Sequence, residues 1–463
     1  MTAFKTQTLG YPHIGRDREM KRALEGYWKG RLDDEKLLET LQQVEQDAWT
    51  AQGGAGIDYV GVGDATLYDP VLDWAVRFGL VAERFRGLEG LDLTFTMARG
   101  KPGIPALELT KWFDTNYHYL VPEVDTDARP EAHFGGYLDT IRRAQAALGD
   151  RAVPIVLGPL TLLRLSRLQG SFDDVLAALL PLYNGLLEQL KALGVAEVQL
   201  HEPALILADA QEHKERYISA YAALSRPGLP INLVTFFDDL GDAFPWVTAL
   251  PVATISLDFT RGDTAGLAKA HGWPEGKTLG AGVIAGRSVW QVRPRETLEL
   301  IQALPADVSL RLGTSCSLQF VPYQAARETG LPKELRDVLA FAQEKLEELR
   351  LLARAATGDD GAEIAIQANE TAWERFRSFA PSEPEVGRRI EALMPNDFER
   401  EIPYSDRREK QIQLPPLPTT TIGSFPQTKE VRRLRRRFKR GEITPEAYEA
   451  GIDAWIGYTI GAQ

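Results

Sequence analysis

Positively charged side chains gather near the N-terminus, where Arg18, Lys21 and Arg22 flank Glu19 and Met20. Spacings of three and four residues place Arg18 with Lys21 or Arg22 on one face of an α-helix. Two cations on a chain whose net charge is −12 suit a ligand that carries several carboxylates. On composition alone, a solvated helix face explains the same cluster.

A second basic candidate is Lys111, in the segment ELTKWFDTNYHY. The same segment holds four aromatic residues, Trp112, Phe113, Tyr117 and Tyr119. Their rings could pack this segment against the body of the protein and hold Lys111 in place. An aromatic structural loop with an incidental lysine is the alternative. For His118 we predict a hydrogen bond within the segment rather than a metal.

Carboxylate and thiol candidates stand apart from one another in the sequence. Glu202 follows a predicted strand, and a barrel hydrolase would need a second carboxylate beside it, such as Asp258 or Asp64. We favour a structural role for Glu202. Cys316 is the only cysteine, which excludes an intrachain disulfide and a Cys-rich zinc site, and we interpret it as a buried structural thiol.

Composition narrows the class of protein. Of the 463 residues, 44% are apolar and 25% are charged, which is enough for a full core. No run of 18 apolar residues predicts a membrane-spanning helix, and the N-terminus lacks a secretory signal, so a cytoplasmic location is expected. The negative net charge disfavours nucleic acid and anionic membranes, although residues 432–440 hold seven basic side chains.

The elements that must position these side chains alternate between strands and helices. Short apolar runs predict eight strands near residues 6–10, 58–62, 153–157, 197–201, 231–236, 254–258, 279–284 and 309–313. Segments with helical apolar spacing lie between most of them, so we predict an α/β fold, a (βα)8 TIM-type barrel. About 90 residues separate the second and third strands, which predicts a long insertion there.

The C-terminal third is predicted to contain helices, a linker and the start of a second domain. Residues 333–357 have the pattern of one long amphipathic helix, and residues 400–418 are polar and proline-rich. We predict a barrel with a helical extension over 1–395, a linker over 396–417, and an incomplete second (βα)8 barrel over 418–463.

A repeat supports the second domain. Residues 8–12, TLGYP, resemble residues 421–426, TIGSFP, and a basic helix and a glycine follow each of them. From the basic helix onward, the two copies keep a constant separation of 411 residues. The order of strand, turn, basic helix and glycine indicates duplication of a barrel start.

Six segments together resemble the cobalamin-independent methionine synthase family. They are TLGYPHIGRDREMKRALEGYWKG, ELTKWFDTNYHYLVPE, VQLHEPAL, GAGVIAGRSVW, TSCSL and PTTTIGSFPQT. They occur in the family's order across the chain. The resemblance implies two barrels that arose by duplication. It also implies methyl transfer from 5-methyltetrahydropteroyltri-L-glutamate to L-homocysteine, which gives L-methionine without cobalamin.

The resemblance also implies roles for particular residues. It assigns Arg18, Glu19, Met20, Lys21 and Lys111 to folate binding. It assigns a homocysteine-binding role to three consecutive residues near the C-terminus, Ile422, Gly423 and Ser424. A glycine there would permit close backbone approach to an amino-acid ligand, although a strand-end turn is a serious alternative.

Two features depart from the family pattern. The family prefers Asp before Glu-Pro, where this chain has His201. The family's zinc ligands are His, Cys, Glu and Cys residues downstream of the first helix of the second barrel, and we expect them to be absent from this chain. We therefore expect a truncated, monomeric enzyme with no catalytic residue and no metal ligand of its own, inactive alone. A non-catalytic barrel that binds folate polyglutamates and the unrelated hydrolase are the alternatives.

Overall fold

The computed structural model describes residues 4–125, 129–305, 308–380, 383–420, 423, 425 and 427–463. The chain divides into two compact units, Met1–Pro381 and Ser382–Gln463, which we describe separately. The boundaries expected at 395/396 and 417/418 remain predictions. No helix in the described part is both long and apolar enough to cross a membrane.

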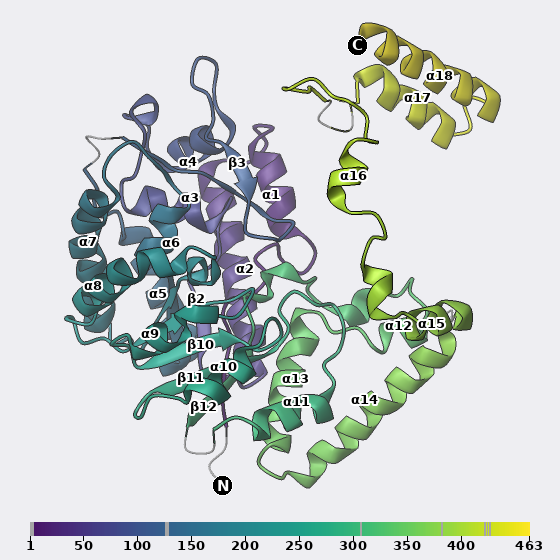
Figure 1. Cartoon of the computed structure of the whole chain (residues 1–463). Coiled ribbons are helices and arrows are strands. Elements are labelled where there is room, and N and C mark those ends of the chain that lie inside the picture. Colours follow the sequence, from purple (N-terminus) through teal and green to yellow (C-terminus); the bar gives the residue numbers. More distant parts are fainter. Residues whose placement is uncertain are drawn as a thin grey trace. The chain divides into compact units, whose positions relative to one another are not determined.

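A parallel sheet of eight strands forms the centre of the first unit (Figure 1). In order around the sheet, its strands are β1 (Lys5–Gln7), β12 (Ser309–Thr314), β11 (Thr278–Ile284), β10 (Thr254–Asp258), β9 (Ile231–Val234), β8 (Val198–His201), β6 (Ala152–Leu157) and β2 (Val60–Val62). The Tyr59 amide donates to the Thr6 carbonyl at 2.9 Å, and the Thr8 amide donates to the Tyr59 carbonyl at 3.0 Å. These two bonds join β1 to β2, so the sheet closes and the predicted (βα)8 barrel is confirmed.

The strands lie where the apolar runs predict them, because both faces of each are covered. Every residue of β6, β8, β9 and β10 is buried. Helices cover the outer face, as is typical of parallel barrels. They include α1 (Glu19–Tyr27), α2 (Asp34–Gly54), α5 (Gly135–Leu148), α6 (Pro159–Arg164), α7 (Phe172–Ala192), α8 (Lys214–Leu224), α9 (Phe244–Ala249), α10 (Thr264–His271) and α11 (Pro294–Gln302).

Polar side chains inside the barrel satisfy one another. Gln7 donates through Nε2 to Ser256 Oγ at 2.8 Å. Asn232 donates through Nδ2 to Gln7 Oε1 at 3.2 Å and accepts from the Ser256 hydroxyl at 2.8 Å. These hydrogen bonds link β1, β9 and β10 across the inside of the barrel. Each of the three buried side chains has a partner, so the bonds offset the cost of burying polar groups.

The insertion between β2 and β6 has its own secondary structure. It contains α3 (Pro70–Arg77), α4 (Gly90–Arg99), β3 (Leu109–Lys111), β4 (His118–Leu120), β5 (Glu123–Val124) and α5. Strands β3 and β4 form an antiparallel hairpin in which Lys111 lies opposite His118. The turn of this hairpin, residues 112–117, is called the strap below.

One predicted helix is wrong. Residues 333–357 do not form a single helix but two, α12 (Lys333–Arg336) and α13 (Ala342–Ala355). Between them, the Ala340 amide donates to the Val289 carbonyl at 2.8 Å, and the Gln291 amide donates to the Val338 carbonyl at 2.9 Å. These long-range bonds replace helical ones, so tertiary pairing overrides the helical periodicity. Helix α14 (Asp360–Phe379) follows.

The second unit is helical in its described part. It contains α15 (Pro384–Glu391), α16 (Tyr404–Arg408), α17 (Lys429–Lys439) and α18 (Pro445–Ala462). Helix α16 lies within the predicted linker. The Phe438 and Tyr448 rings stack at 4.5 Å and join α17 to α18. The strand expected near residues 421–426 lies mostly outside the described residues.

Candidate functional site

A cavity of about 630 Å³ opens beside the start of α1. Its walls come from the segment before α1 and α1 itself, from the loop after β2, from Tyr117 of the strap, and from the segment after β12. Except for Tyr117, these segments follow the carboxyl ends of barrel strands, the face at which barrel proteins bind ligands.

Three cations line this cavity without a counter-ion. Within the described ranges, Arg18 and Lys21 have no ion-pair partner, and Arg16 makes only a hydrogen bond, from Nη2 to Gln324 Oε1 at 3.1 Å. A fourth cation, Arg327, is neutralised by Asp17. Unpaired cations in a cavity of an acidic protein favour a ligand with carboxylates. Sequence reasoning missed Arg16 and Arg327, since neither belongs to a helical pair.

The backbone turns sharply at the first of the predicted residues. Arg18 has φ 61° and ψ 40°, the left-handed region, directly before α1 begins. A non-glycine residue there costs about 1 kcal/mol, and such strain is typical of functional sites. The Glu19 carboxylate accepts from the Asp17 amide at 2.9 Å and so fixes this turn. Glu19 does not line the cavity, whereas Met20 does and is buried.

Lys111 does not line this cavity, although it belongs to the hairpin whose turn supplies Tyr117. Its side chain is exposed on β3, and among the described residues it has no ion-pair partner. Tyr117, at the other end of the strap, does line the cavity. The structure therefore brings Arg18, Met20 and Lys21 together and places Lys111 on the hairpin that supplies one wall.

Two uncharged polar groups complete the cavity. His13 Nδ1 and Thr66 Oγ1 are buried, and neither has a hydrogen-bond partner in the part of the chain described. Burial lowers the pKa of His13 to about 4, so its ring is neutral near pH 7. Unpartnered buried groups of this kind can bind amide or hydroxyl groups of a ligand.

The mouth of the barrel contains a smaller cavity of about 50 Å³. Asp64, His201 and Trp112 line it. The Asp64 carboxylate accepts from the Tyr11 amide at 2.9 Å, and burial raises the pKa of Asp64 to about 7. His201 bonds to Gln199 Oε1 at 3.0 Å, and burial lowers the pKa of His201 to about 3. A neutral imidazole and a capped carboxyl do not form a nucleophile–base pair.

Glu202 is fully buried and lines neither cavity. Its Oε2 accepts from the Thr161 amide at 2.7 Å and from the Thr161 hydroxyl at 2.5 Å, and Oε1 accepts from the Leu160 amide at 3.2 Å. Burial raises the pKa of Glu202 to about 7, while these donors oppose the shift. The carboxylate joins β8 to the first turn of α6, which favours the structural interpretation over the hydrolase alternative.

Cys316 is likewise buried, and its thiol donates to the Ser317 carbonyl at 3.7 Å. Burial raises the pKa of this thiol above its ordinary value, so it is not a nucleophile near pH 7. No group of three or more His, Cys, Asp or Glu side chains in the described ranges is placed to hold a metal ion. The described residues therefore do not fit a zinc site.

The predicted homocysteine segment is only partly described. Ile422 and Ser424 lie outside the described residues. Gly423 has φ 99°, a conformation that favours glycine over any residue with a side chain. The role proposed for these three residues stays a prediction.

Comparison with known proteins bears on the whole chain. Residues 5–309 match the family described as "Cobalamin-independent synthase, N-terminal domain", and residues 417–463 match "Cobalamin-independent synthase, Catalytic domain". The chain is 50% identical over 463 residues to the 5-methyltetrahydropteroyltriglutamate–homocysteine methyltransferase of Trichodesmium erythraeum, covering all of this chain and 62% of that protein. It is 54% identical over 469 residues to the protein of the same name from Thermosynechococcus vestitus, covering 99% of this chain and 62% of that one.

A solved structure shares the fold. The B12-independent methionine synthase of Shewanella sp. W3-18-1, in complex with selenomethionine, superimposes with a TM-score of 0.56 at 15% identity. The match covers 77% of this chain and 98% of that one. At such low identity the similarity concerns the fold alone. This chain spans about three fifths of the length of the two curated relatives, at 62% of each.

Proposed function

Because the chain belongs to the cobalamin-independent methionine synthase family, we propose that it serves methyl transfer from 5-methyltetrahydropteroyltriglutamate to homocysteine. In this proposal its barrel binds the triglutamate tail in the cavity beside α1. The observation that carries the proposal is a group of three cations in one cavity wall, Arg16, Arg18 and Lys21, which have no ion-pair partner among the described residues.

The chemistry of the cavity matches such a tail. Each glutamyl unit adds a carboxylate, and guanidinium and ammonium groups bind carboxylates through charge-assisted hydrogen bonds. The amide linkages between the units need neutral partners, which His13 Nδ1 and Thr66 Oγ1 offer. Lys111, exposed on the neighbouring hairpin, supplies a further cation for the part of the tail outside the cavity.

This chain's own contribution to the reaction is binding and orientation. Contacts to a remote part of a substrate supply binding energy that can hold its reacting end in place. In this proposal the second substrate, homocysteine, binds to Ile422, Gly423 and Ser424. The backbone amides of this segment and the Ser424 hydroxyl suit an amino-acid carboxylate.

A second candidate function rests on the carboxyl and thiol groups at and beneath the barrel mouth. Glu202 and Cys316 are buried, Asp64 is half-buried, and all three are hydrogen-bonded, which favours a barrel that binds folate polyglutamates without chemistry. Methionine formation by the purified chain, supplied with both substrates and zinc, tests the second candidate. Turnover by this chain would exclude the second.

Tail binding can be tested by comparing two ligands. Titration of the chain with 5-methyltetrahydrofolate as triglutamate and as monoglutamate should give tighter binding of the triglutamate. The double variant Arg18→Ala/Lys21→Ala should weaken triglutamate binding about tenfold, or about 1.4 kcal/mol, and leave monoglutamate binding unchanged. Arg22→Ala is the matched control, because Arg22 lies on the same helix outside the cavity lining. Equal affinity for the two ligands would overturn the proposal.

A further inference from the structure

The strap reaches across the barrel mouth to loops that follow four different strands. Phe113 packs against Phe237 after β9, with ring centroids 5.7 Å apart. Asp114 binds Arg261 after β10 and Arg287 after β11. The Tyr117 hydroxyl donates to the Gln319 carbonyl, after β12, at 2.8 Å. The strap itself belongs to the insertion after β2.

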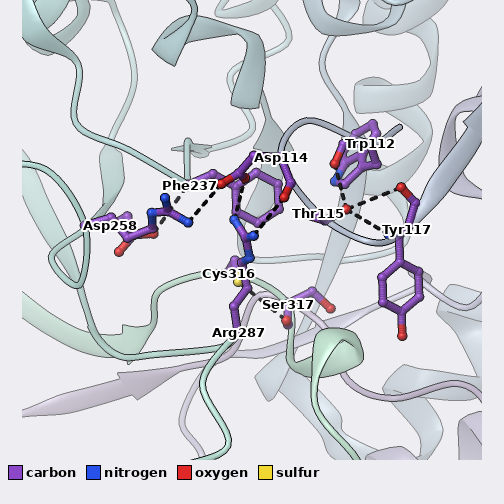
Figure 2. A network of polar contacts seen from close by, with 10 residues as sticks. Trp112, Asp114, Thr115, Tyr117, Phe237, Asp258, Arg287, Cys316 and Ser317 are labelled. Atoms are coloured by element: carbon purple, nitrogen blue, oxygen red, sulfur yellow. Dashed lines mark hydrogen bonds and ion pairs between the residues drawn. The ribbon is translucent and has the colours of Figure 1, made fainter. Parts of the chain in front are cut away.

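Asp114 makes the ionic part of this attachment, and Figure 2 shows its contact with Arg287. Arg287 Nη1 donates to Asp114 Oδ1 at 2.6 Å, and Arg287 Nη2 donates to the Asp114 backbone carbonyl at 3.3 Å. Arg261 Nη1 lies 3.1 Å from the other carboxylate oxygen. Partial burial raises the pKa of Asp114, but the bond from Arg287 and the two positive charges outweigh it and lower that pKa overall.

Hydrogen bonds within the strap join its two ends. The Thr115 hydroxyl donates to the Trp112 carbonyl at 2.7 Å, and the Tyr117 amide donates to Thr115 Oγ1 at 3.0 Å. The Trp112 amide donates to the Tyr117 carbonyl at 2.9 Å. Fixing Asp114 therefore also fixes Tyr117, at the end of the strap, and Lys111, the last residue of β3 directly before it.

Backbone strain marks both sides of the same contact. Phe113 has φ 50° and Phe237 has φ 88°, and with Arg18 they are the non-glycine residues with positive φ in the described ranges. Arg287 lies over the Phe237 ring at 4.9 Å, and the Phe237 amide donates to Asp258 Oδ2 at 3.2 Å. Strained residues persist where surrounding contacts over-determine them, and they cluster at binding sites.

We propose that Asp114 is a positioning residue: by binding Arg287 and Arg261 it holds the strap so that Lys111 and Tyr117 face the polyglutamate tail. The inference rests on the proposed function. Asp114 contacts no part of the ligand. Its side chain is 53% exposed, so its ion pairs are screened and its effect on affinity is modest.

The test measures two quantities in the Asp114→Asn variant of the full chain. The first is the ratio of affinities for triglutamyl and monoglutamyl 5-methyltetrahydrofolate, which should fall about fivefold. The second is amide hydrogen exchange over residues 109–120, which should become faster. Asp114→Glu should restore part of both. Asp139→Asn is the control, because it also neutralises an exposed, ion-paired carboxylate, which binds Arg142 away from the strap.

The outcomes separate the inference from the proposed function. A tail-length preference in the unaltered chain supports the function, and its loss in Asp114→Asn, with melting temperature matching the control, supports the positioning role. An unchanged affinity ratio in Asp114→Asn would overturn the positioning role alone. An unaltered chain that binds both ligands equally overturns the proposed function and the inference with it.

Discussion

The cavity beside α1 and the mouth of the barrel lie in one unit and even share Thr66 as a lining residue, yet they treat charge in opposite ways. In the cavity, Arg18 and Lys21 keep their charges without any counter-ion in the described part of the chain. At and beneath the mouth, Asp64 is half-buried and Glu202 is fully buried, and both accept hydrogen bonds from backbone amides. The cations of the cavity are therefore available to bind a ligand. The carboxylates at the mouth are already hydrogen-bonded to the protein's own backbone.

This difference separates stabilising from binding groups more reliably than residue type does. A buried carboxylate with donors contributes to folding, and its removal leaves those donors unsatisfied. An exposed cation without a partner contributes little to folding, and its removal affects what the protein binds. Variants of Glu202, Asp64 and Arg16 test this division.

Replacing Glu202 with alanine should lower the free energy of unfolding by about 3 kcal/mol, because the Thr161 and Leu160 amides lose a buried acceptor. Urea denaturation of the variant measures this loss. Glu212→Ala removes an exposed glutamate ten residues further along the chain. It is the control, and it should leave the free energy of unfolding almost unchanged. Triglutamate affinity of the folded variant should not change. A stable Glu202→Ala variant with reduced affinity would reverse the division.

Asp64 should make stability depend on pH. Burial raises its pKa to about 7 in the folded chain, so between its ordinary pKa and pH 7 the folded state binds more protons than the unfolded state. The free energy of unfolding therefore falls as pH rises through this window. Asp64→Asn, which keeps an acceptor for the Tyr11 amide, should remove about 2 kcal/mol of the decrease between pH 5.5 and pH 8.

Chemical denaturation at pH 5.5 and pH 8 measures this term. The difference in unfolding free energy between the two pH values should be smaller in Asp64→Asn than in the unaltered chain. Identical pH dependence in both proteins would mean that Asp64 is ionised in the folded protein. The barrel mouth would then contain a charged carboxylate, contrary to the proposed division.

The fold was largely predictable because barrel strands carry a strong local signal. Each of β6, β8, β9 and β10 is a short apolar run buried on both faces, and its bounds follow from that run. The break between α12 and α13 was not predictable. It depends on pairing of Ala340 with Val289, which lie far apart in the sequence.

The candidate site was predictable only where helical spacing revealed it. Arg18 and Lys21 stand three residues apart at a helix start, and they do line one cavity. Arg327 joins them from a segment more than 300 residues away, through its ion pair with Asp17. The attachment of Asp114 to Arg287 spans 173 residues in the same way. Contacts between segments that the folded barrel brings together cannot be predicted from the spacing of residues within a short segment.

The smallest predicted effect distinguishes local contact from overall charge. Arg16 lines the cavity and Arg22 does not, although both are exposed cations at the start of α1. Arg16→Gln should weaken triglutamate binding about threefold, because its screened charge acts at close range. Arg22→Gln removes the same charge and should have little effect at an ionic strength of 0.15 M, where the screening length is about 8 Å. Titration of both variants at this salt concentration and at low salt measures the difference. If the two variants weaken binding equally, the cavity attracts the tail only through its general field, and the unpaired cations are not individual contacts.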